Sequence, residues 1–272
     1  MSGKLYVVGT PIGNLGDMSP RAVETLEKVD FIAAEDTRVT VKLLNHFDIK
    51  KEMLAYYEHN KSTKGNLIID RMLNGETCAV VSDAGMPAIS DPGEDLVRKA
   101  RELGIEVEAV PGPSALITAI SISGFPCGRF SFEGFLSMKK ISRRSHLEEL
   151  KEFKRTMIFY EAPHKLLATL KDMLKYFGER RIVLAREITK IHESVTITTI
   201  SQAIEFYEQN TPKGEFVLIV EGAKSETVTY TLSDAVKIAK ELIKEGKATS
   251  FAAKQAAETT GIKKGDIYKE II

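Results

Sequence analysis

Four loops rich in glycine and proline each follow a segment with the composition of a buried strand. They are GTPIGNLG at 9–16, SDAGMPAISDPG at 82–93, VPGPSA at 110–115 and YEAPHK at 160–165. In an open parallel sheet, ligands bind at the carboxyl ends of the strands, where such loops collect. Glycine lets a ligand approach the backbone closely, and proline stiffens a loop before binding. We therefore predict a small-molecule site built from these loops.

The first loop has the pattern G-x-x-x-G-x-x-G, which is neither the dinucleotide-binding nor the phosphate-binding fingerprint. No lysine follows its glycines to hold a phosphate, so a nucleoside triphosphate or a pyrophosphate is disfavoured as the ligand. Asp83 and Asp91 favour a ligand that carries hydroxyls or a positive charge, such as a ribose, an amino group or a sulfonium. Both residues could equally well stabilise turns.

Strand and helix patterns alternate over residues 1–120 and predict a parallel sheet covered on both faces by helices. The expected strands are 5–9, 31–35, 77–82 and 105–110. The first helix is expected to begin at Ser19–Pro20, and three more at 38–47, 62–74 and 93–103. The fold class of this domain is therefore α/β.

A second α/β domain is expected over residues 121–225, where alternating Thr and Val favour antiparallel or mixed strand pairing. Its expected strands are 130–136, 156–162, 181–187, 193–200 and 215–222, and its expected helices are 142–153, 164–177 and 201–209. Residues 224–230 form a polar link, and residues 226–272 are expected to form a small helical module.

The composition excludes several classes of protein. The 272 residues carry 38 Lys and Arg against 38 Asp and Glu, so nucleic acid could be attracted only by a local basic patch. No stretch is apolar over the ~18 residues of a membrane span, and no signal-peptide core is present. The two cysteines, Cys78 and Cys127, have no metal-ligand spacing. We expect a cytoplasmic protein without a bound metal or a membrane partner.

Residues 138–155 point to an RNA partner. They contain seven Lys and Arg against three Glu, an excess that suits phosphate contacts. A solvated helix with paired Glu and Lys would explain LEELKEFK but not KKISRR. We predict RNA contacts from Lys139, Lys140, Arg143 and Arg144.

The C-terminal module carries a second signal for RNA binding. Ala257, Gly261 and Ile267 have the spacing of a helix-turn-helix, and Lys263 and Lys264 lie at its second helix, where they could contact RNA. A capping helical hairpin has the same spacing, and the sequence does not separate the two alternatives.

Seven motifs occur in a defined order: GTPIGNLGDMSPRA, AAEDTR, SDAGMPAISDPG, VPGPSA, FYEAPHK, AREITKIHE and KGEFVLIVEG. From about residue 4 to the C-terminus, this set resembles the tetrapyrrole-methylase superfamily and, more closely, the ribosomal RNA small subunit methyltransferase I family. Met86 departs from the family pattern, which usually has Thr there. The resemblance implies two α/β lobes with a cofactor cleft between them and a homodimer. It also implies S-adenosyl-L-methionine-dependent methylation of the ribose 2′-oxygen of a cytidine in 16S rRNA, near the decoding centre.

The resemblance implies which residues contact the cofactor, S-adenosyl-L-methionine. Those of the first domain are Thr10, Pro11, Asp83, Ala84, Gly85, Pro87, Ile89, Gly112, Ser114 and Ala115. Those of the second domain are Tyr160, Ala162, Ala185 and Gly214. Glycine loops could pair with the adenine and the carboxylate, and Tyr160 could form an aromatic wall.

Charged residues at the predicted strand ends are the candidates for catalysis. A ribose hydroxyl is a very weak acid, so its reaction requires a proton acceptor or a group that stabilises the developing negative charge. We hypothesise that Lys190 stabilises the oxyanion and that Glu161 or Asp36 accepts the proton. Other charged candidates are Glu35, Arg38, Arg186, Glu187 and Glu193, and His59, His164 and His192 are titrating alternatives. Each of these residues could instead form a surface ion pair.

Two other functions fit parts of the sequence. A tetrapyrrole C-methyltransferase of the same superfamily would not require the basic segment at 138–155 or the helical tail. A ribosome-assembly factor that has kept the fold but lost the chemistry would bind RNA without binding the cofactor.

Overall fold

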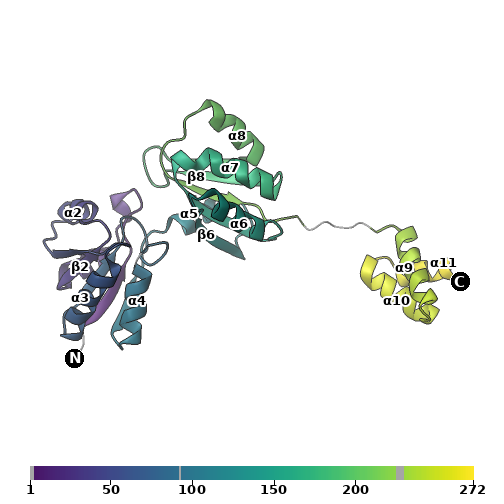
Figure 1. Ribbon diagram of the computed structural model, residues 1–272, viewed down its shortest axis with the longest axis horizontal. Helices are drawn as coiled ribbons and strands as arrows, with labels where there is room; N and C mark the ends of the chain where they lie inside the picture. Colours follow the sequence, from purple (N-terminus) through teal and green to yellow (C-terminus); the bar gives the residue numbers. More distant parts are fainter. Residues whose placement is uncertain (1–2, 92, 225–229) are drawn as a thin grey trace. The chain divides into compact units, whose positions relative to one another are not determined.

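The computed structural model describes residues 3–91, 93–224 and 230–272 (Figure 1). The chain divides into two compact units, Met1–Ala223 and Lys224–Ile272. The first unit contains two separate five-stranded sheets, which are the two predicted α/β lobes. Residues 225–229 of the predicted polar link lie outside the described residues.

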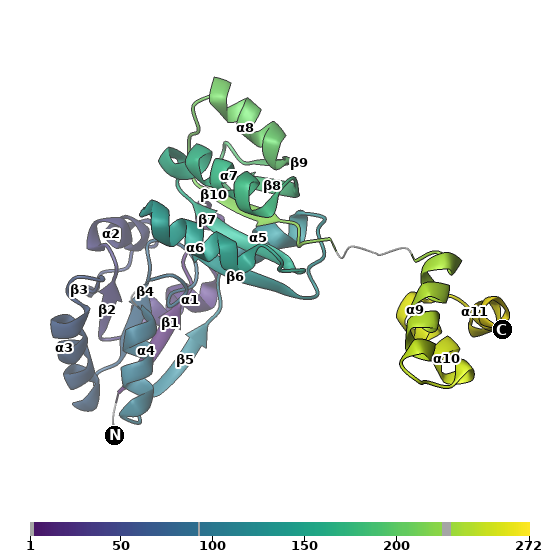
Figure 2. The same ribbon diagram turned by 45° about the vertical axis from the view of Figure 1, so that its right-hand side comes forward.

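The first sheet is parallel and has the strand order β3-β2-β4-β1-β5, which can be followed in Figure 2. Its strands are β1 (Lys4–Val8), β2 (Phe31–Ala34), β3 (Glu52–Ala55), β4 (Cys78–Val81) and β5 (Glu106–Val110). The sequence patterns predicted all of them except β3. That strand lies at the sheet edge, and its sequence EMLA is only partly buried, so it lacks the apolar run that marks a central strand.

Helices cover both faces of this sheet, as predicted. They are α1 (Pro20–Lys28), α2 (Thr37–His46), α3 (Lys61–Leu73) and α4 (Gly93–Glu102), and a short 3₁₀ helix, η1 (Leu15–Asp17), precedes α1. Residues of α1 and α2 pack on one face, and residues of α3 and α4 pack on the other. Helix α1 begins as expected, because the Ser19 side chain accepts a hydrogen bond from the backbone nitrogen of Ala22 and Pro20 takes the first position.

The second sheet is mixed and has the order β6-β7-β10-β8-β9. Its strands are β6 (Phe130–Phe135), β7 (Thr156–Glu161), β8 (Arg181–Arg186), β9 (Ser194–Thr199) and β10 (Phe216–Val220). Strands β6 and β7 are parallel, and the other neighbouring pairs are antiparallel. The mixed pairing is one of the two arrangements that the alternating Thr and Val predicted.

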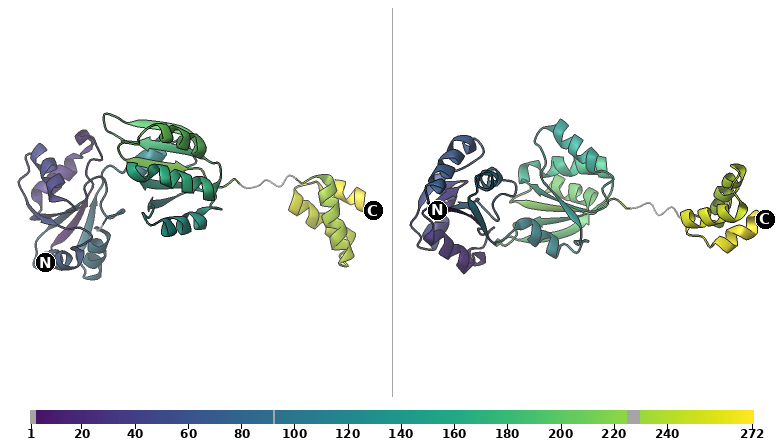
Figure 3. Two further views of the ribbon diagram at one scale, coloured as in Figure 1. Left: turned by 45° about the horizontal axis from the view of Figure 1, so that its top comes forward. Right: turned by 90° about the horizontal axis from the view of Figure 1, so that it is seen from below.

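Helices cover both faces of the second sheet (Figure 3). They are α5 (Ala115–Ile122), α6 (Lys140–Leu150), α7 (Pro163–Phe177) and α8 (Ile200–Gln209). Helix α5 packs against one face, where Leu116 and Ile120 join the cluster that contains Ile158 and Val217. The other three helices pack against the opposite face. The predicted domain boundary at residue 120 therefore falls inside a helix that belongs to the second lobe.

The second unit contains α9 (Leu232–Lys244), α10 (Thr249–Thr260) and α11 (Lys264–Ile271). Its small core consists mainly of alanines, including Ala235 and Ala252, together with Ile267 of α11. Helix α10 ends at Gly261, which has a left-handed φ of 72° and so forms the turn that the sequence predicted. Within the described residues, no helix combines the length and the apolar character that a membrane crossing requires.

Candidate active site

A cavity of about 430 Å³ lies between the carboxyl ends of the first sheet and the second sheet of the same unit. This volume is typical of a small-molecule site. All four predicted loops contribute to its wall, through Ile12, Asp83, Ser114 and Tyr160 among others. The four loops therefore meet at one cavity, as the direction of the strands predicted.

Most of the residues expected to contact the cofactor line this cavity. They are Asp83, Ala84, Gly85, Ile89, Ser114, Ala115, Tyr160, Ala162 and Ala185. The others are absent from its wall: Thr10, Pro11, Pro87, Gly112 and Gly214.

Thr10 and Gly112 lie outside the wall, but each of them supports a loop that forms the wall. Thr10 and Gly85 form an isolated β-bridge, in which each backbone nitrogen donates to the other residue's carbonyl oxygen at 3.0 and 3.1 Å. A Cβ atom at Gly112 would lie 2.8 Å from the Cα of Gly9. The observed role of Gly112, which is predicted to contact the cofactor, is to allow two backbone segments to touch.

Glu35 and Asp83 form an acidic pair on the cavity wall, at the ends of the neighbouring strands β2 and β4. Glu35 accepts a hydrogen bond from the backbone nitrogen of Asp83 at 3.3 Å, and Asp83 accepts one from the backbone nitrogen of Asp36 at 3.1 Å. Burial raises the pKa of Glu35, and the charge of Asp83 raises it further, against the lowering effect of its hydrogen bond. Burial also raises the pKa of Asp83. Such a pair favours a cationic ligand.

Asp91 lies on the wall but has the turn-stabilising role that the sequence left open. Its Oδ1 atom accepts hydrogen bonds from the backbone nitrogens of Ala88 and Gly93, both at 2.8 Å. Ala88 and Ser90 have φ values of 69° and 68°, so this loop is held in a conformation that L-residues rarely adopt.

Tyr160 forms an aromatic part of the wall. Its hydroxyl oxygen accepts a hydrogen bond from the backbone nitrogen of Leu116 at 3.1 Å, and burial raises its pKa. Its ring meets Phe132 and Phe135 edge-on, with centroid distances of 4.9 and 5.4 Å. A planar ligand group could therefore pack on an apolar surface here.

Glu161 is 1 % exposed and lies on the cavity wall, and both of its carboxylate oxygens have partners. Oε1 accepts hydrogen bonds from the backbone nitrogen of Ala162 and pairs with the ammonium of Lys165, both at 2.9 Å. Oε2 accepts a hydrogen bond from the hydroxyl of Thr169 at 2.5 Å. These contacts join the end of β7 to the first turns of α7. Lys165 is four residues from Glu161, a spacing that the sequence analysis did not use.

Lys190 lies on the wall beside two acidic residues. Its ammonium is 2.8 Å from Glu187 Oε1 and 2.9 Å from Glu215 Oε2, and both carboxylates also line the cavity. Burial lowers the pKa of Lys190, but the hydrogen bonds to the two carboxylates outweigh this effect and raise its pKa overall. Lys190 is therefore a fixed cation and is unsuited to act as a base at neutral pH.

Asp36 is not part of the cavity wall. Its Oδ1 atom accepts a hydrogen bond from the backbone nitrogen of Arg38 at 2.8 Å, which caps α2. Its hydrogen bonds with the Arg38 guanidinium and backbone hold the pKa of Asp36 at about 2. The structure corrects our expectation of a proton acceptor here, because a carboxyl so acidic is a weak base.

The residues predicted to contact RNA differ in their exposure. Lys139 and Lys140 are exposed at the start of α6. Arg143 is buried, with its guanidinium 2.7 Å from Asp172, so it cannot reach a phosphate at the surface. Arg144 is partly exposed and lies 3.0 Å from the same carboxylate. The letters KKISRR do not reveal which positions of the helix are buried. The prediction that Arg143 contacts RNA is corrected, because Arg143 is at one of the buried positions.

In the second unit, Lys263 and Lys264 are exposed at the start of α11, and the Lys264 ammonium donates to the Ser250 hydroxyl at 3.2 Å. They are available for contact with a partner.

Several wall residues were absent from the sequence-based prediction. They are Ile12, Ser82, Met86, Ser90, Phe135, Ile188, Glu215, Phe216 and Val217. Glu215, Phe216 and Val217 belong to the KGEFVLIVEG motif, but no role was predicted for them. Phe135 is the last residue of β6, and no local signal marked it.

Comparisons with known proteins identify the family of this chain. Residues 4–204 match the family described as Tetrapyrrole (Corrin/Porphyrin) Methylases. Relatives named Ribosomal RNA small subunit methyltransferase I are similar over almost their full length. The one from Xylella fastidiosa is 50% identical over 98% of this chain and 98% of its own. The one from Halalkalibacterium halodurans is 48% identical over 98% of this chain and 93% of its own.

A shorter relative of the same name, from Thermotoga maritima, is 48% identical over 81% of this chain and 99% of its own. About a fifth of this chain therefore has no counterpart in that relative.

Solved structures share the fold. Diphthine synthase aligns with a TM-score of 0.61 at 11% identity and covers 81% of this chain and 90% of its own. Uroporphyrin-III C-methyltransferase from Thermus thermophilus, solved in complex with S-adenosylhomocysteine, aligns with a TM-score of 0.58 at 16% identity and covers 80% of this chain and 97% of its own.

Proposed function

This chain belongs to the tetrapyrrole methylase family and to the ribosomal RNA small subunit methyltransferase I group within it, and we propose that it methylates a ribose 2′-oxygen of a cytidine in 16S rRNA. S-adenosylmethionine is the methyl donor, and the small ribosomal subunit or its RNA in the cytoplasm is the substrate. The observation that carries this proposal is the cavity, which combines an acidic pair, an aromatic wall and a fixed cation, all from residues within the range 4–204 that matches the family.

The cavity fits the donor chemically. S-adenosylmethionine supplies an electrophilic methyl group on a positively charged sulfonium. Glu35 and Asp83 would favour that charge, and their placement at adjacent strand ends also suits ribose hydroxyls. Tyr160 would pack against the adenine or the sulfonium. The backbone of Ala115, in the first turn of α5, would pair with a remaining polar group of the donor.

Lys190 is our candidate for stabilising the negative charge that develops on the ribose oxygen. Its ammonium is held in place by two carboxylates, so it would need no reorganisation during the reaction, a condition under which one charged group has a large effect on rate. Glu161 and Asp36 carry other contacts, which weakens their case as proton acceptors. The hydroxyl proton would pass to Glu35, to Asp83 or to solvent.

RNA affinity would come from outside the cavity. Lys139 and Lys140 of α6 and Lys263 and Lys264 of α11 are exposed cations that could contact phosphates. In this proposal the first unit performs the chemistry and the second unit adds affinity for RNA.

We also propose that the protein is a homodimer, as the resemblance implies. Light scattering on the full chain would give twice the mass of one chain, and a single-chain mass would exclude the dimer.

The proposed function is tested by mapping ribose methylation in rRNA. The 16S rRNA of a strain that lacks this protein should be missing one 2′-O-methylcytidine, and the purified protein with S-adenosylmethionine should restore it. Running free 16S rRNA and assembled small subunits in parallel identifies the substrate. A complete set of ribose methyl groups in the deletion strain would refute the proposal.

A further inference from the structure

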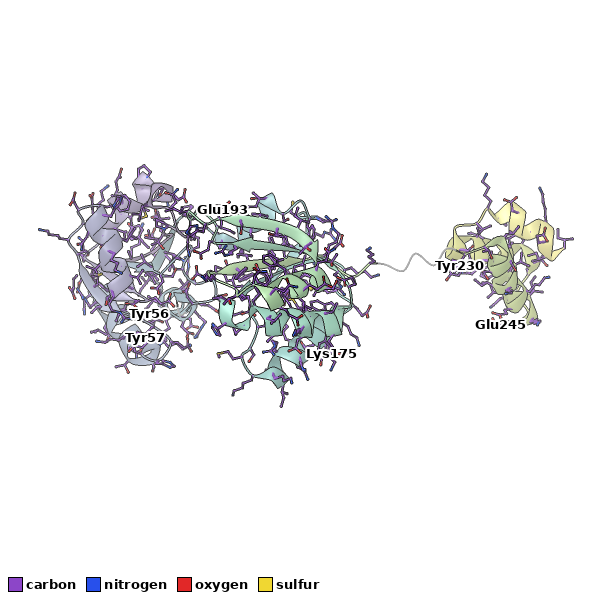
Figure 4. The ribbon with its side chains drawn as sticks, turned by 90° about the horizontal axis from the view of Figure 1, so that it is seen from above. Tyr56, Tyr57, Lys175, Glu193, Tyr230 and Glu245 are labelled. Atoms are coloured by element: carbon purple, nitrogen blue, oxygen red, sulfur yellow. The ribbon has the colours of Figure 1, made fainter. Side chains whose placement is uncertain are left out.

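The loop after β1 touches the loop between β8 and β9 across the two lobes of the first unit. A Cβ atom at Gly13 would lie 2.5 Å from the Cγ of Lys190, 2.8 Å from the Oγ1 of Thr189 and 3.2 Å from the carbonyl oxygen of Ile188. Figure 4 labels Glu193 in the second of these loops, where the lobes meet. Only a glycine at position 13 leaves room for this contact.

The loop that carries Lys190 has an unfavourable backbone conformation. Glu187 and Thr189 have φ values of 52° and 67°, in the left-handed region that non-glycine residues rarely adopt. The Oγ1 atom of Thr189 is buried and has no hydrogen-bond partner among the described residues. Strain of this kind persists only where surrounding contacts enforce it, and it concentrates at functional sites.

Contacts from within the second lobe hold one side of this loop. The backbone nitrogen of Glu187 donates to the carbonyl oxygen of Glu215 at 3.0 Å, and the backbone nitrogen of Glu215 donates to Glu187 Oε1 at 2.9 Å. The backbone nitrogen of Thr189 donates to Glu193 Oε2 at 2.7 Å. A side chain at Gly214, whose φ is 79°, would overlap the side chain of Glu187. Gly13 contacts this loop from the other lobe.

We infer that Gly13 is a positioning residue, which presses the strained 187–190 loop into place from the first lobe and thereby sets the Lys190 ammonium on the cavity wall. The expected effect of Gly13 on the rate of methyl transfer rests on the proposed function. The expected effect of Gly13 on the position of Lys190 does not. Without the contact, Lys190 would leave Glu187 and Glu215, and the cavity would lose its fixed cation.

Lysine labelling tests the structural part without any activity. In the parent, an amine-reactive reagent should modify Lys190 slowly, because two carboxylates hold it protonated. Labelling of Lys190 in Gly13→Ala, followed by mass spectrometry, should be about threefold faster or more. The matched control is Gly128→Ala, because a Cβ at Gly128 meets no heavy atom within 4 Å. An unchanged Lys190 labelling rate in Gly13→Ala would overturn the inference.

A second variant tests the inference even if Gly13→Ala misfolds. Thr189→Gly removes both the strain and the atom that touches Gly13, so this chain should fold at least as well as the parent. Because glycine adopts a φ near 67° without strain, the loop of this variant no longer depends on the contact, so adding Thr189→Gly to Gly13→Ala should return the Lys190 labelling rate to within about twofold of the parent. A double variant that folds but still labels Lys190 about threefold faster than the parent would count against the inference, even if Gly13→Ala alone cannot be purified.

Methyl transfer tests the functional part through a double-mutant cycle. At saturating S-adenosylmethionine and RNA, Gly13→Ala should lower the single-turnover rate about 10- to 100-fold while leaving cofactor affinity within about twofold. If Gly13 acts through Lys190, adding Gly13→Ala to Lys190→Met should cause no further loss. Additive losses would refute the connection. If Lys190 is labelled faster in Gly13→Ala but the parent protein transfers no methyl group, the proposed function is wrong and the positioning role of Gly13 is still supported.

Discussion

Glu35 Oε2 accepts a hydrogen bond from the backbone nitrogen of Asp83 at 3.3 Å, so two carboxylates from neighbouring strands share one side of the cavity. Burial raises the pKa of both groups, the charge of Asp83 further raises the pKa of Glu35, and the charge of Asp36 further raises the pKa of Asp83. The free protein therefore holds negative charge where it is unfavourable for stability but suited to a cationic ligand.

Replacing Glu35 with glutamine should stabilise the free protein and weaken cofactor binding. A carboxyl whose pKa is raised by folding favours the folded state while protonated, and this contribution is lost as the pH rises through the folded pKa. The gain in melting temperature from Glu35→Gln should therefore be larger at pH 7 than at pH 4. Thermal unfolding at both pH values measures the gain, with Glu205→Gln on the exposed side of α8 as the control.

Calorimetry with S-adenosylmethionine at pH 7 measures the second effect of Glu35→Gln. Binding should weaken by about tenfold, since one charge-assisted contact is lost. Affinity equal to that of the parent would show that Glu35 does not face the donor.

Replacing Lys190 with methionine should slow methyl transfer by about 10²–10³-fold, the usual effect of removing one preorganised electrostatic group. Cofactor binding should remain intact. Single-turnover rates at saturating donor and RNA measure the effect. The control is Lys175→Met, because Lys175 is an exposed residue of α7 (Figure 4). A rate within about threefold of the parent would assign Lys190 a structural role and direct attention to Arg186.

Glu161→Gln should destabilise the protein by about 3 kcal/mol, because it leaves the Lys165 ammonium without its buried partner. Denaturant unfolding measures this loss. The double variant Glu161→Gln with Lys165→Met should recover part of it, since no unpaired charge then remains. If Glu161→Gln is as stable as the parent but loses two decades of turnover, Glu161 takes part in the chemistry.

Gly112→Val should lower stability even without cofactor, since the added side chain would collide with the backbone of Gly9. We expect a loss of about 1–3 kcal/mol, as for other overpacked sites. Thermal unfolding of the free protein measures it, with Gly128→Val as a comparison in open space. If Gly112→Val has the melting temperature of the parent but does not bind the donor, Gly112 contacts the ligand after all.

Replacing Lys139 and Lys140 with glutamine should weaken RNA binding and reduce the slope of log affinity against log salt by about 1–2, because fewer counterions are released. Filter binding across a salt series measures the slope. Arg143→Gln should instead destabilise the protein, since Asp172 would lose a buried partner. An unchanged slope in the lysine variant would remove the start of α6 from the RNA interface.

The amino-acid sequence by itself determined most of the elements and the edge of the first sheet at which its glycine-rich loops gather. Buried strands such as FIAA and CAVV are continuous apolar runs, and Ser19 with Pro20 begins α1, so both are recognisable from local spacing alone. Parallel strands place their following loops at one edge, so the loops at Asp83 and Ser114 could be expected to share a cavity. These inferences need only local chemistry and the direction of the strands.

Only the tertiary structure decided which side chains remain available to a ligand. Gly112 faces Gly9, Arg143 faces Asp172, and Glu161 faces Lys165 and Thr169. Gly13 meets Lys190 from the other lobe. Such pairings follow from how helices and sheets pack over long sequence separations, and a carboxylate or a glycine has the same local signature whether its neighbour is a ligand or another part of the chain.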